Sequence, residues 1–156
     1  MNWDAIGAIG EIVGALAVVV SLVYLASQIR AQNKEARITA MHDISVGYRD
    51  TLATVAEREI VEIIDKALED YDALTRAESL RLIAAVGRIF RVWEEAYLQH
   101  QAGRLDQRVW APMTRQFNAY MSLQPFHRVW EIRKQYFDDE FQTFVDDGER
   151  AEYILQ

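Results

Sequence analysis

Residues 5–27 read AIGAIGEIVGALAVVVSLVYLAS, and this stretch decides the architecture of the chain. It is 23 residues long and carries one charged side chain, Glu11. As an α-helix it would extend about 34 Å, which is enough to cross the ~30 Å hydrocarbon core of a bilayer. Trp3 and Tyr24 lie near its two ends, where aromatic rings favour the level of the lipid headgroups. The stretch therefore predicts a transmembrane anchor over residues 1–29.

The charges that flank the apolar stretch predict its orientation. No Lys or Arg precedes Arg30, and Lys34 and Arg37 follow closely. Basic residues beside a transmembrane helix stay preferentially in the cytoplasm. A cleaved signal peptide would need a positively charged start and a shorter apolar core. A buried helix of a soluble protein is the alternative, but residues 18–24 are apolar on every side. We therefore expect an uncleaved anchor with its amino terminus outside.

One side of the predicted anchor consists of small residues at steps of three and four. These residues are Gly7, Gly10, Gly14, Ala17 and Ser21. In lipid, small residues allow two helix backbones to approach closely, and van der Waals contact then holds the helices together. Glycine and alanine are also common in such helices by composition alone. The regular spacing favours a helix-association face, for a second copy or for a partner membrane protein.

Glu11 lies about 10 Å into the predicted span, beside the row of small residues. Ionisable groups inside a membrane are costly and generally face protein or water. Three interpretations remain for this intramembrane polar residue. It can hydrogen-bond across an interface, line a path for protons or cations in an oligomer, or reach toward the outer surface. Packing at an interface is the preferred interpretation.

Beyond residue 29, apolar residues recur at helical spacing and no stretch alternates as a strand would. We expect an all-α protein, in which the transmembrane helix continues into a small cytoplasmic helical bundle over residues 30–156. The continuation has heptad-spaced apolar residues at Ile38, Met41, Tyr48, Leu52 and Val55. A long central helix, ending near residue 102, is expected to bury Ile83, Val86, Phe90, Trp93 and Tyr97, with Leu82 and Ile89 at the sides.

Several residues mark the expected helix ends. Thr75 and Glu78 fit a capping box, and Gly103 is a natural residue to follow a helix. Asp106 and Asp138 are expected to cap two later helices, and Pro125 to open another. Pro112 is expected to kink its helix or to start a new first turn. These markers predict four helices between residues 75 and 146.

Composition and motifs argue against several classes of function. Residues 30–156 hold 17 basic and 22 acidic residues, a net charge of −5 without a basic cluster, which disfavours nucleic-acid binding. There is no cysteine for a disulfide or a thiolate site. His42, His100 and His127 fall on different predicted helices, and no metal or phosphate-binding motif is present. We expect neither an enzyme nor a cofactor-binding protein.

Glu94 is the acidic residue closest to the predicted core. Its neighbour Glu95 points about 100° away on the same helix, so the two carboxylates cannot face one site. We interpret Glu94 as a structural carboxylate that meets Arg88, Arg91 or Arg133. The aromatic residues around it are expected to form the core, although aromatic residues can also line a ligand pocket.

Two blocks of the sequence resemble an uncharacterised family of small bacterial hypothetical proteins. The first is AIGAIGEIVG from Ala5, followed by Tyr24-Leu-Ala and Gln28-Ile-Arg30. The second runs from Phe90-x-x-Trp93-Glu94 through Tyr97, Gly103, Trp110, Tyr120 and Trp130-Glu131 to Phe137 and Phe141-x-x-Phe144-Val145-Asp146. The resemblance implies a bacterial membrane protein, and it supplies no catalytic residues.

These observations predict a single-pass protein of the bacterial inner membrane that acts through helix–helix association. It would be a homo-oligomer or an accessory subunit of a membrane complex. The alternative is an oligomeric channel or signalling device that uses Glu11 within the membrane. A membrane-tethered ligand sensor or enzyme is a third class, which would need an enclosed polar pocket among the aromatic residues.

Overall fold

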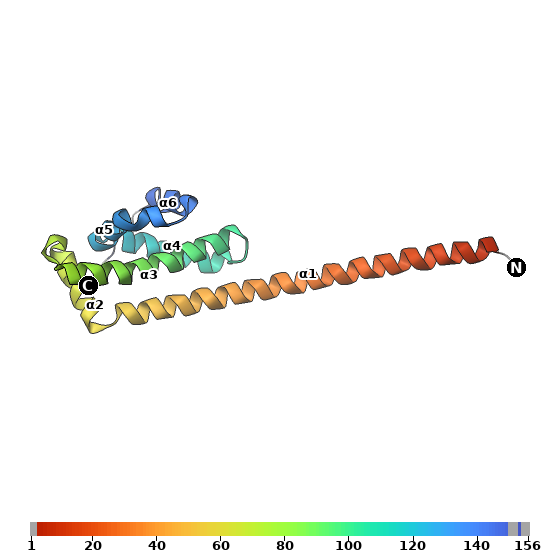
Figure 1. Cartoon of the computed structure of the whole chain (residues 1–156), viewed down its shortest axis with the longest axis horizontal. Helices are drawn as coiled ribbons and strands as arrows, with labels where there is room; N and C mark the ends of the chain where they lie inside the picture. Colours follow the sequence, from red (N-terminus) through yellow and green to blue (C-terminus); the bar gives the residue numbers. More distant parts are fainter. Residues whose placement is uncertain (1–2, 150–152, 154–156) are drawn as a thin grey trace. The chain divides into compact units, whose positions relative to one another are not determined.

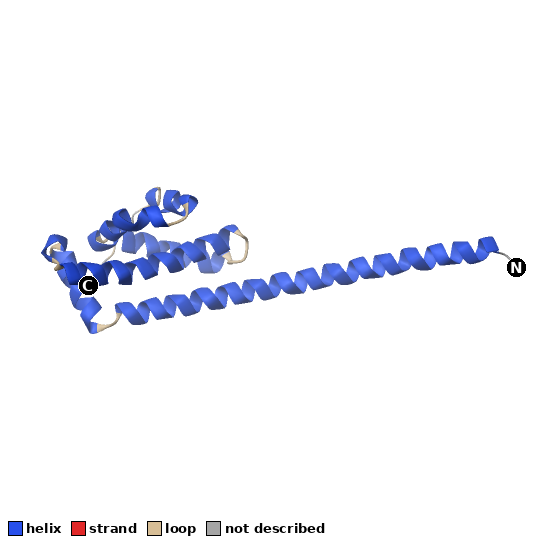
Figure 2. Cartoon of the chain, viewed as in Figure 1, coloured by secondary structure: helices blue, strands red, loops and turns tan. Residues whose placement is uncertain are grey.

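The computed structural model describes residues 3–149 and residue 153. These residues form an all-α structure with six α-helices and two short 3₁₀ helices, and no strand occurs among them (Figures 1 and 2). The elements are α1 (Trp3–Val55), α2 (Arg58–Glu69), η1 (Tyr71–Ala73), α3 (Arg76–Gln101), α4 (Gln107–Met121), α5 (Gln124–Arg133), η2 (Lys134–Tyr136) and α6 (Asp139–Asp146). The predicted fold class, a long apolar N-terminal helix followed by a helical bundle, is confirmed.

The chain divides into two compact units, residues 1–39 and residues 40–156. The helix α1 contributes to both units, because it runs without interruption from Trp3 to Val55. The boundary expected from the sequence, after residue 29, marks the end of the apolar stretch. The structural boundary, after residue 39, marks the position where α1 begins to bury side chains in the bundle.

Residues 40–55 of α1 pack on the bundle with a side that only partly matches the heptad-spaced apolar residues. Ala40, Ile44 and Thr51 are buried, whereas Met41 and Leu52 are 40% and 44% exposed. Tyr48 and Val55 are partly buried, so the buried side lies about one position around the helix from the centre of the heptad-spaced row. The face that packs is the one with small residues, because they let α1 approach its neighbours closely.

The central helix α3 contacts α2, α4, α5 and α6, so the core of the bundle is built around it. Leu82, Val86 and Phe90 are fully buried, and Trp93 is 2% exposed. Ile83 is only partly buried, which corrects the predicted centre of the buried face toward Leu82. The aromatic rings pack edge to face around Phe90, as between Phe90 and Trp130, whose centroids lie 5.3 Å apart. The predicted aromatic core is confirmed.

Most of the predicted helix ends are confirmed. Thr75 and Glu78 form the capping box at the start of α3. Gly103 has a φ of 67°, a conformation that glycine adopts without steric cost. The side chains of Asp106 and Asp138 accept hydrogen bonds from the first backbone N–H groups of α4 and α6. Pro125 lies in the first turn of α5.

Pro112 does not start a new helix. It lies inside α4, which continues unbroken from Gln107 to Met121. Proline removes one backbone hydrogen bond from a helix, a loss that burial of the same helix can offset. Trp110 and Phe117, one on each side of Pro112, are buried in the core. Their packing stabilises α4 as one helix.

Candidate functional site

The first candidate site is the surface of α1 within residues 1–39. The large apolar side chains from Ile9 to Ile29 are each between 54% and 66% exposed, and they lie on all sides of the helix. Among the described residues, α1 is the one helix long and apolar enough to cross a membrane by length and composition. None of that apolar segment is buried within the chain.

The row of small residues lies on this exposed surface. Apart from its chain neighbours and the backbone of its own helix, a Cβ atom placed on Gly7, Gly10 or Gly14 would meet nothing within 4 Å. Ala17 and Ser21 are exposed as well. The Ser21 hydroxyl donates a hydrogen bond of 2.8 Å to the Ala17 carbonyl, so its polar group is satisfied within α1. The row therefore presents a smooth, uncharged backbone surface to any neighbouring helix.

Glu11 is exposed on α1, and it makes no hydrogen bond or ion pair with another described residue. On a regular helix it lies about 80° from the centre of the row of small residues. A helix packed on that row would therefore bring Glu11 to the edge of the interface. Glu11 is the single charged side chain between residues 5 and 29.

The predicted structural role of Glu94 is confirmed. Its Oε2 accepts a hydrogen bond of 2.6 Å from Arg91, and its Oε1 accepts one of 2.7 Å from the backbone N–H of Asp138. Arg91 also donates to the Tyr136 carbonyl at 2.8 Å, and its guanidinium lies 4.1 Å from the centre of the Phe137 ring. Together these contacts fasten the start of α6 to α3.

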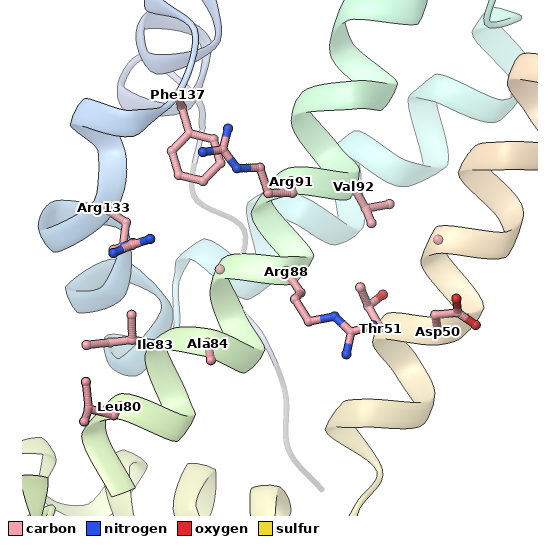
Figure 3. A pocket seen from close by; sticks show the side chains of 12 residues that line it. Asp50, Thr51, Leu80, Ile83, Ala84, Arg88, Arg91, Val92, Arg133 and Phe137 are labelled. Carbon is pink, nitrogen blue, oxygen red and sulfur yellow. The ribbon is translucent and has the colours of Figure 1, made fainter. Parts of the chain in front are cut away.

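A second candidate site is an open hollow of about 550 Å³ on the bundle, between residues 47–51 of α1, the outer side of α3, and Arg133 and Phe137 (Figure 3). Sequence reasoning missed this hollow, because its walls come from distant parts of the chain. Gly47 and Gly87 are among the lining residues, which keeps the surface hollowed. Three arginines line it, together with Asp50, Thr51 and several apolar side chains.

The arginines of this hollow are engaged with the protein. Arg88 donates a hydrogen bond of 2.9 Å to the Thr54 hydroxyl, which ties α3 to α1. Arg91 is held by Glu94, and the Arg133 guanidinium lies 4.8 Å from the Tyr136 ring centre. Figure 3 shows Arg88 pointing toward α1 and Arg91 pointing toward Phe137, so the two guanidinium groups do not face a common point. We assign the hollow to the packing of the bundle.

The histidines are not brought together. His42 and His127 are exposed on α1 and α5, and His100 stacks on Trp110 with ring centroids 5.0 Å apart. Within the described part of the chain, no three His, Asp or Glu residues are placed to hold a metal ion. The acidic residue Asp146, for example, accepts a hydrogen bond of 2.8 Å from the Trp130 indole N–H.

No protein-family model matches the chain, and comparisons with curated proteins and with solved structures gave no significant match.

Proposed function

We propose that this chain is a single-pass membrane protein that acts by joining its N-terminal helix to a second copy or to a partner membrane protein. The observation that carries the proposal is the segment from Ile9 to Ile29, whose large apolar side chains lie on all sides of the helix and are each more than half exposed. A helix that is apolar all round belongs either in a protein core or in a membrane. The bundle does not bury this segment, so lipid is its natural environment.

Two further observations support an associating role rather than a simple tether. The row of small residues is uncovered, and close helix packing in lipid needs such a surface. Glu11 would reach the edge of that interface, where a hydrogen bond across it would reduce the cost of a carboxyl group in lipid. The sequence resemblance and the basic residues after the segment support a proposed location in a bacterial inner membrane, with residues 30–156 in the cytoplasm.

Association is tested by a two-hybrid assay in a bacterial membrane, with the full chain fused to both reporter halves. Gly10→Ile and Gly14→Ile should each lower the signal roughly tenfold, which corresponds to ~1.4 kcal/mol, because a branched side chain keeps the two backbones apart. Ala15→Ile is the matched control. It adds a similar bulk about 120° around the helix from the row of small residues, and it should leave the signal unchanged.

Membrane abundance is measured in parallel by immunoblotting. Wild-type signal from both glycine variants, at equal abundance, would contradict association through this face. The channel alternative makes a different prediction for liposomes. There, ion flux that disappears in Glu11→Gln would favour a conducting oligomer, whereas the absence of flux in the wild-type chain would exclude it.

A further inference from the structure

A second surface of α1 lies just beyond the apolar segment. Arg30, Lys34 and Arg37 are exposed there, and on a regular helix they fall within an arc of about 60°. Asn33 lies about 40° beyond one end of this arc, and the four side chains line a shallow hollow of about 250 Å³. We name these four residues the basic face.

Within the described residues, no carboxylate neutralises the positive charge of the basic face. None of its three cations makes an ion pair with a carboxylate in the described residues. The nearby acidic residue, Glu35, lies about 140° around the helix from Arg30. The basic face therefore offers two guanidinium groups, one ammonium group and one amide to an external anion, and all of them are hydrogen-bond donors.

The same side of α1 is apolar toward its amino terminus. Val19 and Val23 lie within about 20° of Arg30 around the helix, and they are 55% and 65% exposed. One side of the helix thus presents branched apolar side chains followed by cations. This order matches the order of groups in a phospholipid, from its acyl chains to its phosphate.

We propose that the basic face binds the phosphodiester headgroup of an anionic phospholipid in the bilayer that holds α1. This proposal rests on the proposed function, because it needs the apolar segment to lie in a membrane. The centre of the row of small residues is about 180° around the helix from the basic face. A helix packed on the glycines therefore leaves the basic face directed toward lipid, and the two surfaces act independently.

The test uses the full chain reconstituted in vesicles of phosphatidylcholine with one-fifth phosphatidylglycerol. Electron spin resonance measures how strongly spin-labelled phosphatidylglycerol is held at the protein, relative to spin-labelled phosphatidylcholine. We expect a preference of about fivefold for the anionic lipid at low salt, the factor expected of one well-placed cation near an anionic surface. The preference should fall at high salt, where charges are screened.

The variant Arg30→Gln/Lys34→Gln/Arg37→Gln should lose the preference. Its matched control, Arg76→Gln/Arg104→Gln/Arg108→Gln, removes the same charge from the bundle and should keep the preference. A second variant, Ala31→Lys/Lys34→Ala, keeps the net charge but moves one cation about 100° from Arg30, and it should reduce the preference. Full preference in the first variant would overturn the lipid site, and full preference in the last would overturn its restriction to one face.

Two further readings separate the possible causes of failure. Flotation with vesicles after alkaline washing reports insertion: a chain that stays behind contradicts the membrane anchor itself, whereas a chain that floats without lipid preference contradicts the basic face alone. Excess inorganic phosphate is compared with chloride at equal ionic strength. Phosphate should act only as a screening salt, and specific loss of the lipid preference in phosphate would reassign the site to a soluble phosphate.

Discussion

Glu94 and Glu95 are adjacent acidic residues on α3 that differ in their surroundings. Glu94 is 9% exposed and accepts hydrogen bonds from Arg91 and from the backbone of Asp138, whereas Glu95 is exposed. A buried carboxylate is tolerated where its charge is paired and its oxygens are hydrogen-bonded. The position of each residue on the helix therefore decides which carboxylate contributes to stability.

Glu94→Ala should reduce the free energy of unfolding of the bundle by about 2–3 kcal/mol, because it removes charge-assisted hydrogen bonds and leaves the Asp138 N–H without its acceptor. Urea unfolding of the full chain in a mild detergent, followed by tryptophan fluorescence, measures the change. Glu95→Ala is the control, and it should change stability by less than about 0.5 kcal/mol. Equal stability of the two variants would contradict the structural role of Glu94.

The start of α3 combines a capping box with an ion pair from α2. The Thr75 N–H donates to Glu78 at 2.6 Å, the Glu78 N–H donates to the Thr75 hydroxyl at 3.3 Å, and Lys66 donates to both Glu78 oxygens at 3.0 and 2.9 Å. These hydrogen bonds lower the pKa of Glu78 from 4.5 to about 2, and the hydrogen bonds from Lys66 contribute most to the change. The charged form of Glu78 is thus favoured in the folded state.

This lowered pKa predicts the pH dependence of a variant. Since folded Glu78 releases its proton more readily than unfolded Glu78, its charge stabilises the fold fully above about pH 4.5, and that contribution is lost as pH falls toward 2. Glu78→Gln should therefore be less stable than the wild type at pH 7, and the difference should shrink between pH 4.5 and pH 2. Thermal unfolding across this range, followed by circular dichroism, measures the difference.

Lys66→Met provides the comparison, because it removes the main cause of the lowered pKa and keeps the capping box. Lys66→Met should show most of the loss of stability that Glu78→Gln shows at pH 7, and this loss should likewise shrink toward pH 2. A difference between Glu78→Gln and wild type that stays constant from pH 7 to pH 2 would contradict the assignment of the effect to the carboxylate charge.

The helices and their ends could be predicted from the sequence, because local chemistry decides them. Thr75, Gly103 and Asp138 act on backbone groups a few residues away. The packing side of α1 beyond residue 39 could not be predicted in this way. Gly47 approaches α3 so closely that a Cβ atom there would lie 3.2 Å from Val92, and this contact depends on residues 45 positions apart in the chain.

The same distinction applies to the candidate sites. The apolar segment and its row of small residues are local periodic patterns, so the sequence displays both. The hollow around Arg88 and Arg133 is assembled from α1, α3 and the end of α5, and no spacing rule connects these segments. The basic face is a local pattern of one helix. It can act as a lipid site only because the neighbouring apolar segment is exposed.

The chain contains no cysteine, so its membrane topology can be tested by introducing single cysteines without first removing native ones. In intact cells a membrane-impermeant maleimide should label Asn2→Cys. It should label Asn33→Cys and Gln101→Cys only after lysis, because the proposed orientation, which follows the positive-inside tendency, has residues 30–156 in the cytoplasm. Labelling of Asn33→Cys in intact cells would contradict this orientation.

Because α1 supplies both the apolar segment and part of the bundle core, a protease could shed a folded bundle only by cutting within a narrow window. A cut between residues 30 and 39 would leave Ala40, Ile44 and Thr51 with the bundle. A cut after residue 55 would remove all three residues and open the core along α3. In the proposed membrane-bound protein, the position of the cut, within a few helical turns, would therefore decide whether the released bundle keeps its core.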